Sequence, residues 1–369
     1  MYFTRLILRQ FRNLSSLDLD LRSGLTIFVG ANGAGKSNIL EGLSLLASGQ
    51  SHRGAETRYW IQEGKEESAL IAQVEGEESL ALDFKQKRGK ARQFRVNNLS
   101  FVRQKDWAGK IPLVSFSPDE LDLVKGEPSV RGRMLNAVLS QSDPRYAETL
   151  SRYTKTLEER NAALRLIRDG QAKPEVLVPW TLSLVREGVC LTMARNLFLK
   201  DFGSRVEKRW ADLSRGRDRG GVFYRPSFAM TDDVASMEDN CHRRLAELKN
   251  GEIALGSTLA GPHRDDVELR LDNDVARVRA SQGQSRTLAL AWKWEEKFFL
   301  RERLGREPVS ILDDVFSELD PERRAQLTDL MVSGGQCFLS LTDFSVWGTD
   351  PSLSGARVVG VAGGVVVSS

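Results

Sequence analysis

The stretch that decides the fold is Gly30-Ala31-Asn32-Gly33-Ala34-Gly35-Lys36-Ser37, which fits the pattern GxxxxGK(S/T). It follows a continuous apolar run at residues 25–29, typical of a strand buried on both faces, and it precedes a helical pattern at residues 38–47. Backbone N–H groups in such a loop wrap a polyphosphate closely, and side chains at its glycines would crowd it. The sequence therefore predicts a phosphate-binding strand–loop–helix unit.

The residues of this loop have different roles in holding a nucleotide. A helix that begins near Lys36 directs the positive end of its dipole at the phosphates, Lys36 reaches the β- and γ-phosphates, and Ser37 ligates magnesium. We therefore expect ATP and Mg²⁺ as cofactors. The residues expected to contact the nucleotide are those of the loop and the start of the helix: Gly30, Ala31, Asn32, Gly33, Ala34, Gly35, Lys36, Ser37 and Asn38.

Two carboxylates near the other end of the chain complete the predicted site. Asp313 ends the apolar run at residues 309–312, which is typical of a buried strand, and Asp314 follows it directly. A carboxylate at such a strand end holds magnesium through water, so Asp313 is the candidate metal residue. Asp314 is the candidate catalytic residue, beside Lys36, that orients or deprotonates the attacking water. Strand ends often carry solvated Asp, so this assignment depends on the glycine loop.

A third segment, Ser281-Gln282-Gly283-Gln284, opens an apolar helical pattern at residues 285–304. A Ser at a helix start is usually an N-cap. The same geometry, a hydroxyl beside a helix N-terminus, also forms a receptor for a γ-phosphate. The residues alone leave both interpretations open.

Composition places the chain among soluble globular proteins. It has 369 residues, of which 41% are hydrophobic and 28% charged. We expect no membrane span, because no run of about 18 apolar residues is present, and no secretory signal at the start. The three cysteines, Cys190, Cys241 and Cys337, are odd in number and lack CxxC spacing, which argues against disulfides and a zinc site and predicts a cytoplasmic protein.

Basic residues are clustered although the net charge is only +3. One run without acidic residues is the candidate DNA contact, formed by Lys85, Lys87, Arg88, Lys90, Arg92 and Arg95. A second group contains Arg215, Arg217, Arg219 and Arg225 and is tempered by Asp218. Such clusters are usually solvated loops, so a phosphate-backbone contact is one of two interpretations.

The pattern along the chain predicts an α/β fold with an inserted helical lobe. The first part reads as mixed sheet, and residues 146–167 carry a helical apolar stripe that Arg160 interrupts. Strands are expected at 267–271, 276–278, 309–313 and 337–341, with helices between and after them. If the loop and Asp313 share one magnesium ion, the chain ends must fold together. We therefore expect an ATPase lobe from residues 1–118 and 255–369, with a mostly helical lobe at 119–254 inserted between its halves.

Several blocks together resemble the RecF family of bacterial DNA-repair ATPases, relatives of the Rad50 and SMC heads. The resemblance runs along most of the chain, and the fold it implies is a P-loop ABC-type ATPase head. Besides the glycine loop, the blocks are Phe11-Arg12-Asn13-Leu14, Ser51-His52-Arg53, Phe116-Ser117-Pro118-Asp119-Glu120-Leu121, Val124-Lys125-Gly126, Gly261-Pro262-His263-Arg264-Asp265-Asp266, Ser281-Gln282-Gly283-Gln284-Ser285-Arg286 and Leu312-Asp313-Asp314-Val315-Phe316-Ser317-Glu318-Leu319-Asp320.

This resemblance implies a function. It implies an ATP-dependent homodimer that binds double-stranded DNA and its junctions with single strands, and that acts at gapped or stalled replication sites in recombinational repair of DNA damage, the SOS response included. A RecR-type mediator is the expected partner, with help in loading a recombinase.

The resemblance also assigns residues. It implies that Ser281, Gln282, Gly283 and Gln284 form a signature acting across the dimer, and that Asp320 lies in the D-loop, which touches the partner's site. Arg12 and Asn13 resemble positions near the nucleotide in related heads, although a surface turn explains them as well.

Some residues depart from the family pattern. Most cassette ATPases have Glu where Asp314 stands, and the shorter Asp predicts weak, slow ATP hydrolysis, with DNA stimulation expected from the family. Ser285 stands where Gln is commoner, and Thr342 or Asp343 stands where a γ-phosphate-sensing His is usual. His263 has a structural or a catalytic role, and His52 is a possible contact of DNA or nucleotide.

Other classes with a glycine loop fit less well. A transporter's nucleotide-binding subunit has only a short helical segment between loop and signature. An SMC-like structural head carries longer arms than this helical lobe allows. A GTPase-like switch needs an Asn-Lys-x-Asp motif, which the sequence does not contain.

Overall fold

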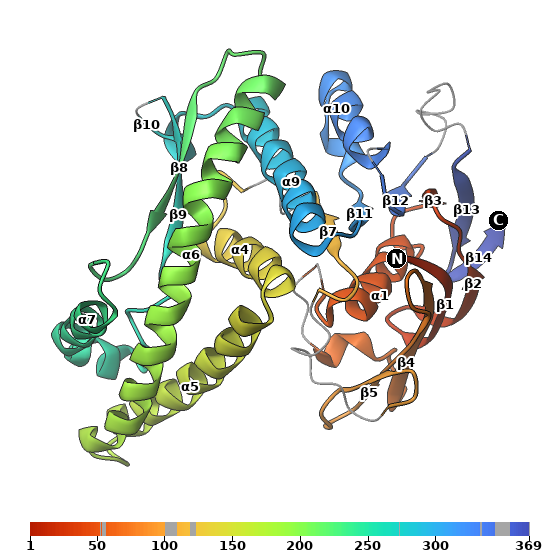
Figure 1. Ribbon diagram of the computed structural model, residues 1–369. Helices are drawn as coiled ribbons and strands as arrows, with labels where there is room; N and C mark the ends of the chain where they lie inside the picture. The colour runs from red at the N-terminus through yellow and green to blue at the C-terminus, as the bar shows by residue number, and fades with distance from the viewer. Residues whose placement is uncertain are drawn as a thin grey trace. The chain divides into compact units, whose positions relative to one another are not determined.

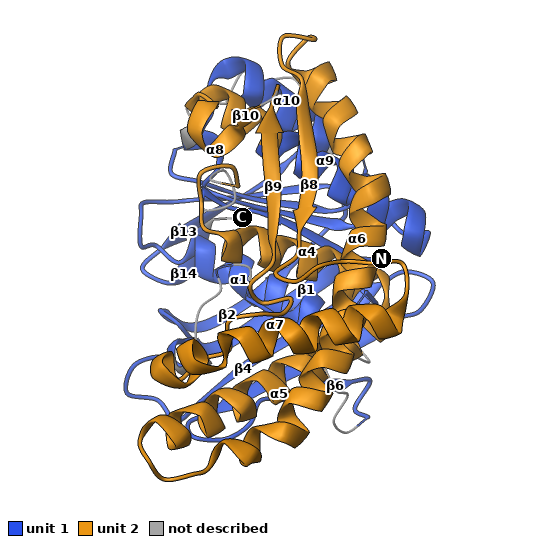
Figure 2. Cartoon of the chain, turned by 90° about the vertical axis from the view of Figure 1, so that its left-hand side faces the viewer, with its two compact units in different colours: residues 1–122, 289–369 blue, residues 123–288 orange. Residues whose placement is uncertain are grey.

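The computed structural model describes residues 1–51, 53, 57–99, 109–118, 123–272, 274–332, 334–343 and 355–368 (Figure 1). The chain forms two compact units, one from residues 1–122 with 289–369 and one from 123–288 (Figure 2). The chain ends therefore fold together in one unit and the middle folds as the other. The expected boundary at 254 differs from this division, because residues 255–288 pack with the middle of the chain.

The first unit contains a six-stranded, mostly parallel sheet. Its order is β14-β13-β3-β12-β11-β7. The strands are β3 (Leu25–Val29), β7 (Leu113–Phe116), β11 (Val309–Asp313), β12 (Cys337–Leu341), β13 (Arg357–Ala362) and β14 (Val365–Ser368). Because β3, β12 and β11 are parallel neighbours, the loop after β3 and the end of β11 come to the same edge of the sheet.

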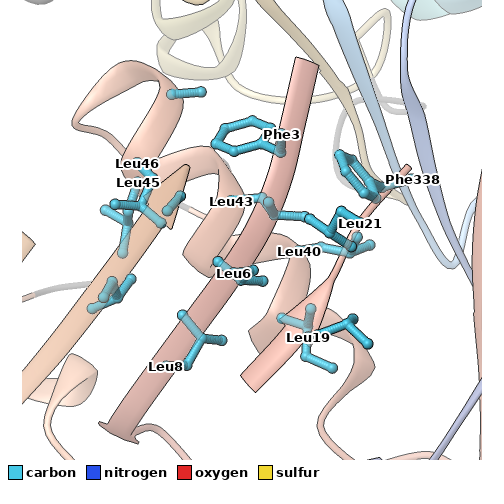
Figure 3. Packing of buried hydrophobic residues seen from close by; sticks show 14 of the residues in the cluster. Phe3, Leu6, Leu8, Leu19, Leu21, Leu40, Leu43, Leu45, Leu46 and Phe338 are labelled. Carbon is cyan, nitrogen blue, oxygen red and sulfur yellow. The ribbon is translucent and has the colours of Figure 1, made fainter. Parts of the chain in front are cut away.

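A second sheet of this unit is antiparallel, in the order β2-β1-β4-β5-β6. Its strands are β1 (Tyr2–Phe11), β2 (Leu14–Asp20), β4 (Glu67–Glu75), β5 (Leu80–Lys87) and β6 (Gln93–Val96). Leucines of helix α1 (Lys36–Ser48) belong to the same buried cluster as leucines of β1 and β2 (Figure 3). This cluster fixes α1, and with it the end of the glycine loop, against the sheet.

The helices of the first unit follow the alternation expected from the sequence. Besides α1, the described part of this unit contains the 3-10 helices η1 (Thr57–Trp60) and η3 (Phe316–Glu318) and the α-helix α10 (Pro321–Val332). Helix α9 (Gln282–Leu304) contains the predicted helix at 285–304. The expected strands at 309–313 and 337–341 are confirmed, because β11 and β12 have these bounds, and every residue of each strand is buried.

The second unit combines helices with a small antiparallel sheet, β10-β9-β8. Its elements are α4 (Pro128–Ser142), α5 (Pro144–Arg168), η2 (Pro174–Leu177), α6 (Val178–Leu213), β8 (Gly220–Arg225), α7 (Val234–Leu255), β9 (Asp266–Leu271), β10 (Asp274–Val275) and α8 (Ala276–Arg279). Figure 2 shows α6 running beside β8 in this unit. The inserted lobe is mostly helical, as expected, and the sheet is an addition.

Arg160 does not interrupt the apolar stripe of α5. Its side chain is 3% exposed and forms an ion pair of 2.6 Å with Glu252 of α7, which is fully buried. The guanidinium also donates to Thr258 and Thr181. The expectation of a broken stripe was wrong, because a buried arginine whose charge is paired with Glu252 occupies a stripe position as an apolar residue would.

Two further expectations differ from the structure. The strand expected at 276–278 is the one-turn helix α8, in which Ala276 is buried and Val278 is 82% exposed. Three residues are too few for periodicity to separate the two forms. Strand β8 was not expected from the sequence, because this strand begins with two glycines, and glycine is depleted in strands. Gly220 has to be glycine there, since a Cβ would lie 1.9 Å from Cζ3 of Trp210.

One stretch among the described residues, Pro174–Leu213, is long and apolar enough to cross a membrane by length and composition. This differs from the expectation of no such run. Core helices of soluble proteins pass the same test, and α6 buries Arg195 in hydrogen bonds to Tyr146, Asn136 and the carbonyl of Pro262. Of the apolar window, 39% is buried, and length and composition alone make this stretch a weak candidate for a membrane span.

Candidate functional site

The glycine loop has the backbone geometry that its composition predicts. Gly33 and Gly35 have φ of 80° and 115°, in the region that favours glycine. At Gly30 a Cβ would lie 2.1 Å from the carbonyl oxygen of Val361. The turn between β13 and β14 also contacts the loop, because Gly364 N–H donates to the carbonyl of Ala34 at 2.9 Å. No local pattern of residues marks this C-terminal hairpin as a neighbour of the loop.

Lys36 is held inside the loop. Its Nζ donates to the carbonyl oxygens of Gly30 at 2.6 Å and Ala31 at 3.0 Å. Burial lowers the pKa of Lys36, and the carboxylates of Asp314 and Asp313 act in the opposite direction. The loop therefore holds a buried ammonium group whose hydrogen-bond partners are neutral carbonyls.

Ser37 and Asp313 are in contact although they lie far apart in the sequence. Ser37 Oγ donates to Asp313 Oδ1 at 2.7 Å, and Ser340 Oγ of β12 donates to the same oxygen at 2.8 Å. Hydroxyl and carboxylate oxygens are ligands that Mg²⁺ accepts, so these residues fit the predicted cation. Among the described residues no group of three His, Cys, Asp or Glu side chains could hold a metal. A cation here would need ligands beyond this carboxylate and hydroxyl.

Asp314 has an unusual backbone conformation, with φ of 52°. Its N–H donates to Ser340 Oγ at 2.8 Å, and its carbonyl accepts from Ser317 Oγ at 2.9 Å. Asp and Asn adopt this left-handed conformation more readily than longer side chains do. The turn itself therefore favours Asp over the Glu of most cassette ATPases, at the position proposed for the water-activating residue.

Arg12 and Asn13 are placed beside the loop, and each is fixed by a protein partner. Arg12 forms two hydrogen bonds, at 2.8 and 2.9 Å, with Glu41 of α1, whose side chain is fully buried. Asn13 donates to the carbonyl of Gly33 at 2.9 Å and accepts from Asn38 at 2.7 Å. Asn13 thus braces the loop, and Arg12 braces α1. Glu41 carries no signal in the sequence that marks it as a partner of Arg12.

The segment Ser281–Gln284 lies in the second unit and caps α9. Ser281 Oγ accepts from the N–H of Gln284 at 3.1 Å, and the side-chain oxygen of Gln284 accepts from the N–H of Ser281 at 2.9 Å. This reciprocal pair is a capping box. The N-cap interpretation is confirmed, and Ser281 and Gln282 are exposed at the helix start.

Asp320 is the N-cap of helix α10. Its carboxylate accepts from the N–H of Arg323 at 3.0 Å, and it is paired with the side chain of Arg323 at the start of α10. Asp320 is exposed, which is compatible with a contact to another molecule.

In the structure, acidic residues lie next to the basic run at 85–95 and reduce its local positive charge. Three basic residues of the run are paired with nearby acids. Lys87 pairs with Glu67 of the neighbouring strand β4 at 2.9 Å, Arg88 with Glu66 just before β4 at 3.9 Å, and Lys85 with Asp83 of its own strand β5 at 3.7 Å. Arg92 donates to the carbonyl of Gly49 at 3.2 Å, while Lys90 and Arg95 lie in the turn and on β6. A role of this run in DNA binding stays a prediction.

His263 is part of a buried network. Its Nε2 lies 3.1 Å from the carbonyl of Thr258, and its Nδ1 lies 2.6 Å from the hydroxyl of Tyr153. A carbonyl only accepts, so Nε2 carries the proton and Nδ1 accepts from Tyr153. Burial lowers the pKa of His263 to about 4. This environment supports the structural role for His263; His52 lies outside the described residues, as do residues 119–121 of another family block.

The sheet, the glycine loop and the Ser37–Asp313 contact define a P-loop ATPase head of the ABC type. Comparison with known proteins gives the same class: the model of the RecF/RecN/SMC N terminal domain matches residues 2–340. The chain is 38% identical over 340 residues to the DNA replication and repair protein RecF of Heliobacterium modesticaldum, with 91% of each chain covered. It is 37% identical over 348 residues to RecF of Acidothermus cellulolyticus, covering 92% of this chain and 93% of that one.

Solved structures agree with this. Two structures of the recombination mediator protein RecF in the RecFOR pathway, RecF-ATPrS and RecF-ATP, superpose with a TM-score of 0.87 at 28% identity. They cover 99% and 100% of this chain and 97% of each RecF chain. The Smc head of Pyrococcus furiosus has a TM-score of 0.52 at 15% identity, covers 99% of this chain and 95% of that chain, and shares the fold alone. The chain belongs to the RecF family of DNA replication and repair proteins, as its sequence blocks predict.

Proposed function

We propose that this chain is an ATP-dependent DNA-binding protein of recombinational repair, which dimerises around ATP at stalled or gapped replication sites and helps to load a recombinase. One observation carries the nucleotide part of the proposal. Ser37 of the glycine loop and Asp313 of a distant strand are in hydrogen-bond contact. A phosphate loop and a magnesium carboxylate act on one nucleotide only where a single cation reaches both.

Each residue of the proposed site has a defined task. The loop N–H groups and Lys36 bind the triphosphate, and Lys36 exchanges its carbonyl partners for phosphate oxygens. Ser37 and Asp313 hold Mg²⁺, which when bound neutralises charge on the β- and γ-phosphates. Asp314 orients or deprotonates the attacking water. Because its side chain is one methylene shorter than Glu, hydrolysis is slow and ATP acts mainly as a clamp.

The dimer supplies the second half of each site. Ser281 and Gly283 of one copy present a helix N-terminus to the γ-phosphate bound by the other copy, and Asp320 lies in the adjoining contact. Ser281 is exposed and its helix start is already ordered by its cap, which supports this role. ATP bound between two copies then favours the dimer by mass action.

DNA and protein partners follow from the relatives. Double-stranded DNA and its junctions with single strands are the proposed substrates, and a RecR-type mediator is the proposed protein partner, in the cytoplasm. The proposed DNA contact is the basic run of Lys85, Lys87, Arg88, Lys90, Arg92 and Arg95. Affinity for DNA should fall steeply as salt rises.

Sedimentation with and without ATP tests this function. The wild-type protein should become dimeric with ATP, whereas Ser281→Arg should bind ATP and remain monomeric. Asp314→Asn should bind ATP and hold the dimer closed, with hydrolysis lowered by roughly 10²-fold. A wild-type protein that stays monomeric with saturating ATP would refute the proposal.

A further inference from the structure

Beside the signature, a loop at the end of α6 carries an acidic residue within an arginine-rich stretch. This Asp218 lies 66 positions before Gln284, and its Oδ1 accepts from Gln284 Nε2 at 2.8 Å. Gln284 is the third residue of α9 and shares the capping box with Ser281. The loop of the second basic group therefore has a direct contact with the predicted signature.

The contact determines which way the amide of Gln284 points. An ionised carboxylate only accepts hydrogen bonds, so the NH₂ group of Gln284 must face Asp218. The amide oxygen then faces the N–H of Ser281, from which it accepts at 2.9 Å. A reversed amide would place its NH₂ group against that N–H and lose both hydrogen bonds. Asp218 thus stabilises the one orientation that holds the backbone of Ser281.

The loop is held in place without help from Gln284. At the end of α6, Gly216 N–H donates to the carbonyl of Ala211 at 2.7 Å, and Asp218 N–H donates to Ser214 Oγ at 3.2 Å. Arg217 Nε donates to the carbonyl of Ser214 at 2.9 Å, and Trp210 packs on Gly220. The backbone of Asp218 is therefore anchored at the end of α6 by contacts that do not involve Gln284.

We propose that Asp218 is a positioning residue for the signature: through Gln284 it fixes Ser281 and the first turn of α9 in the conformation that receives a phosphate held by the partner copy. This rests on the function proposed above. Asp218 touches no nucleotide in this scheme, so its loss weakens ATP-dependent dimerisation and leaves ATP binding by the separate chain unchanged.

The first test compares Asp218→Ala with Asp232→Ala, which removes an exposed carboxylate of the same unit. By sedimentation with saturating ATP, the dimer of Asp218→Ala should be about tenfold weaker, the effect of losing one hydrogen bond to a charged group. Asp232→Ala should match the wild type, and all three proteins should bind a fluorescent ATP analogue equally as monomers. Equal dimerisation of Asp218→Ala and wild type would overturn the proposal.

An exchange of donor and acceptor tests the mechanism, even if Asp218→Ala does not fold. Gln284→Glu alone sets two carboxylates against each other and should weaken the dimer. In the double variant Asp218→Asn/Gln284→Glu, the new amide donates to the new carboxylate, which still accepts from Ser281 N–H. This variant should return the dimer to within about twofold of wild type, since both hydrogen bonds are kept. A double variant no better than Gln284→Glu would refute positioning through Gln284.

Ser281→Arg separates the two levels of failure. If wild type dimerises with ATP and Ser281→Arg does not, while Asp218→Ala dimerises normally, only the role of Asp218 is wrong. If Ser281→Arg dimerises as wild type does, the shared site itself is wrong, and the role of Asp218 fails with it.

Discussion

The buried arginines of the second unit and Lys36 in the glycine loop of the first unit differ in the partners that hold their charged groups. In the second unit, guanidinium groups contact carboxylates and hydroxyls: Arg160 pairs with Glu252, and Arg195 lies 3.8 Å from Asp265. In the glycine loop, the ammonium of Lys36 donates to two neutral carbonyls of its own loop, unlike the buried Lys293–Glu296 ion pair elsewhere in the same unit. The arginines of the second unit already have acidic partners, whereas Lys36 is a cation with which a bound anion can pair.

This difference separates architecture from function. A buried ion pair that loses one member leaves an uncompensated charge, so the buried ion pairs of the second unit contribute to the stability of that unit. Lys36 loses only two carbonyl contacts when a phosphate replaces them, and it gains an opposite charge. We therefore expect substitutions in the second unit to lower stability, and those at the loop to lower ATP affinity.

The largest effect is expected from Glu252→Ala. Removing this carboxylate leaves Arg160 buried without its ion pair, which should lower the free energy of unfolding by about 3–5 kcal/mol. Glu247→Ala is the matched control, because the Glu247–Arg244 pair of the same helix is exposed. That control should cost less than about 1 kcal/mol. Urea denaturation measures both, and equal losses would remove the distinction between buried and exposed pairs.

Lys36→Met should lower the affinity for ATP and leave stability almost unchanged. ATP affinity should fall about a hundredfold, since a charged contact with the phosphates is lost. The midpoint of urea unfolding should stay close to wild type, because only loop carbonyls lose a partner. Isothermal titration with ATP and denaturation of the same sample give the two numbers. A strongly destabilised Lys36→Met protein would show that Lys36 contributes to stability as the buried ion pairs of the second unit do.

Acid should weaken the second unit through His263. Its pKa is about 4 in the folded state, below its ordinary value, so the unfolded chain binds more protons between these values. Stability is therefore complete above the ordinary pKa and is lost as pH falls, by about 2 kcal/mol from pH 7 to pH 5. Burial raises the pKa of neighbouring Asp265, which acts in the opposite direction as pH falls.

Comparison with His263→Gln isolates this contribution. The variant should be less stable at neutral pH but should lose about 2 kcal/mol less than wild type between pH 7 and pH 5. Chemical denaturation at several pH values measures the difference. Parallel pH profiles of the two proteins would show that His263 is not buried in its neutral form.

The smallest effect concerns the hairpin at the glycine loop. Gly364 has φ of 78°, and a Cβ there would lie 2.5 Å from the carbonyl oxygen of Asn13, which braces the loop. Gly364→Ala should lower ATP affinity by about threefold, through the left-handed backbone strain and the shift of Asn13. At Gly363, with φ of 55°, nothing lies within 4 Å of such a Cβ. Gly363→Ala shares the left-handed backbone strain but not the clash with Asn13, so it should lower ATP affinity less than Gly364→Ala does. An equal loss in both would exclude the Asn13 contact as the cause.

Local patterns allowed prediction of the parts of the fold that depend on neighbouring residues. The glycine loop, its flanking strand and helix, and the Asp313 strand follow from short apolar runs and glycine positions. Arg160 was misinterpreted because its partner Glu252 comes from a helix far along the chain. The contacts of Glu41 with Arg12, of Gly364 with Ala34 and of Asp218 with Gln284 also join distant segments, and no local signal marks such pairs.

Mixing two defective variants tests the central claim most directly. Lys36→Met lacks a working loop and Ser281→Arg lacks a working signature, so neither should hydrolyse ATP or dimerise with it alone. A mixed dimer contains one complete site, formed by the loop of the Ser281→Arg chain and the signature of the Lys36→Met chain. The account predicts that mixing restores ATP hydrolysis and ATP-dependent dimers. Activity equal to the sum of the two separate variants would contradict a nucleotide site shared between copies.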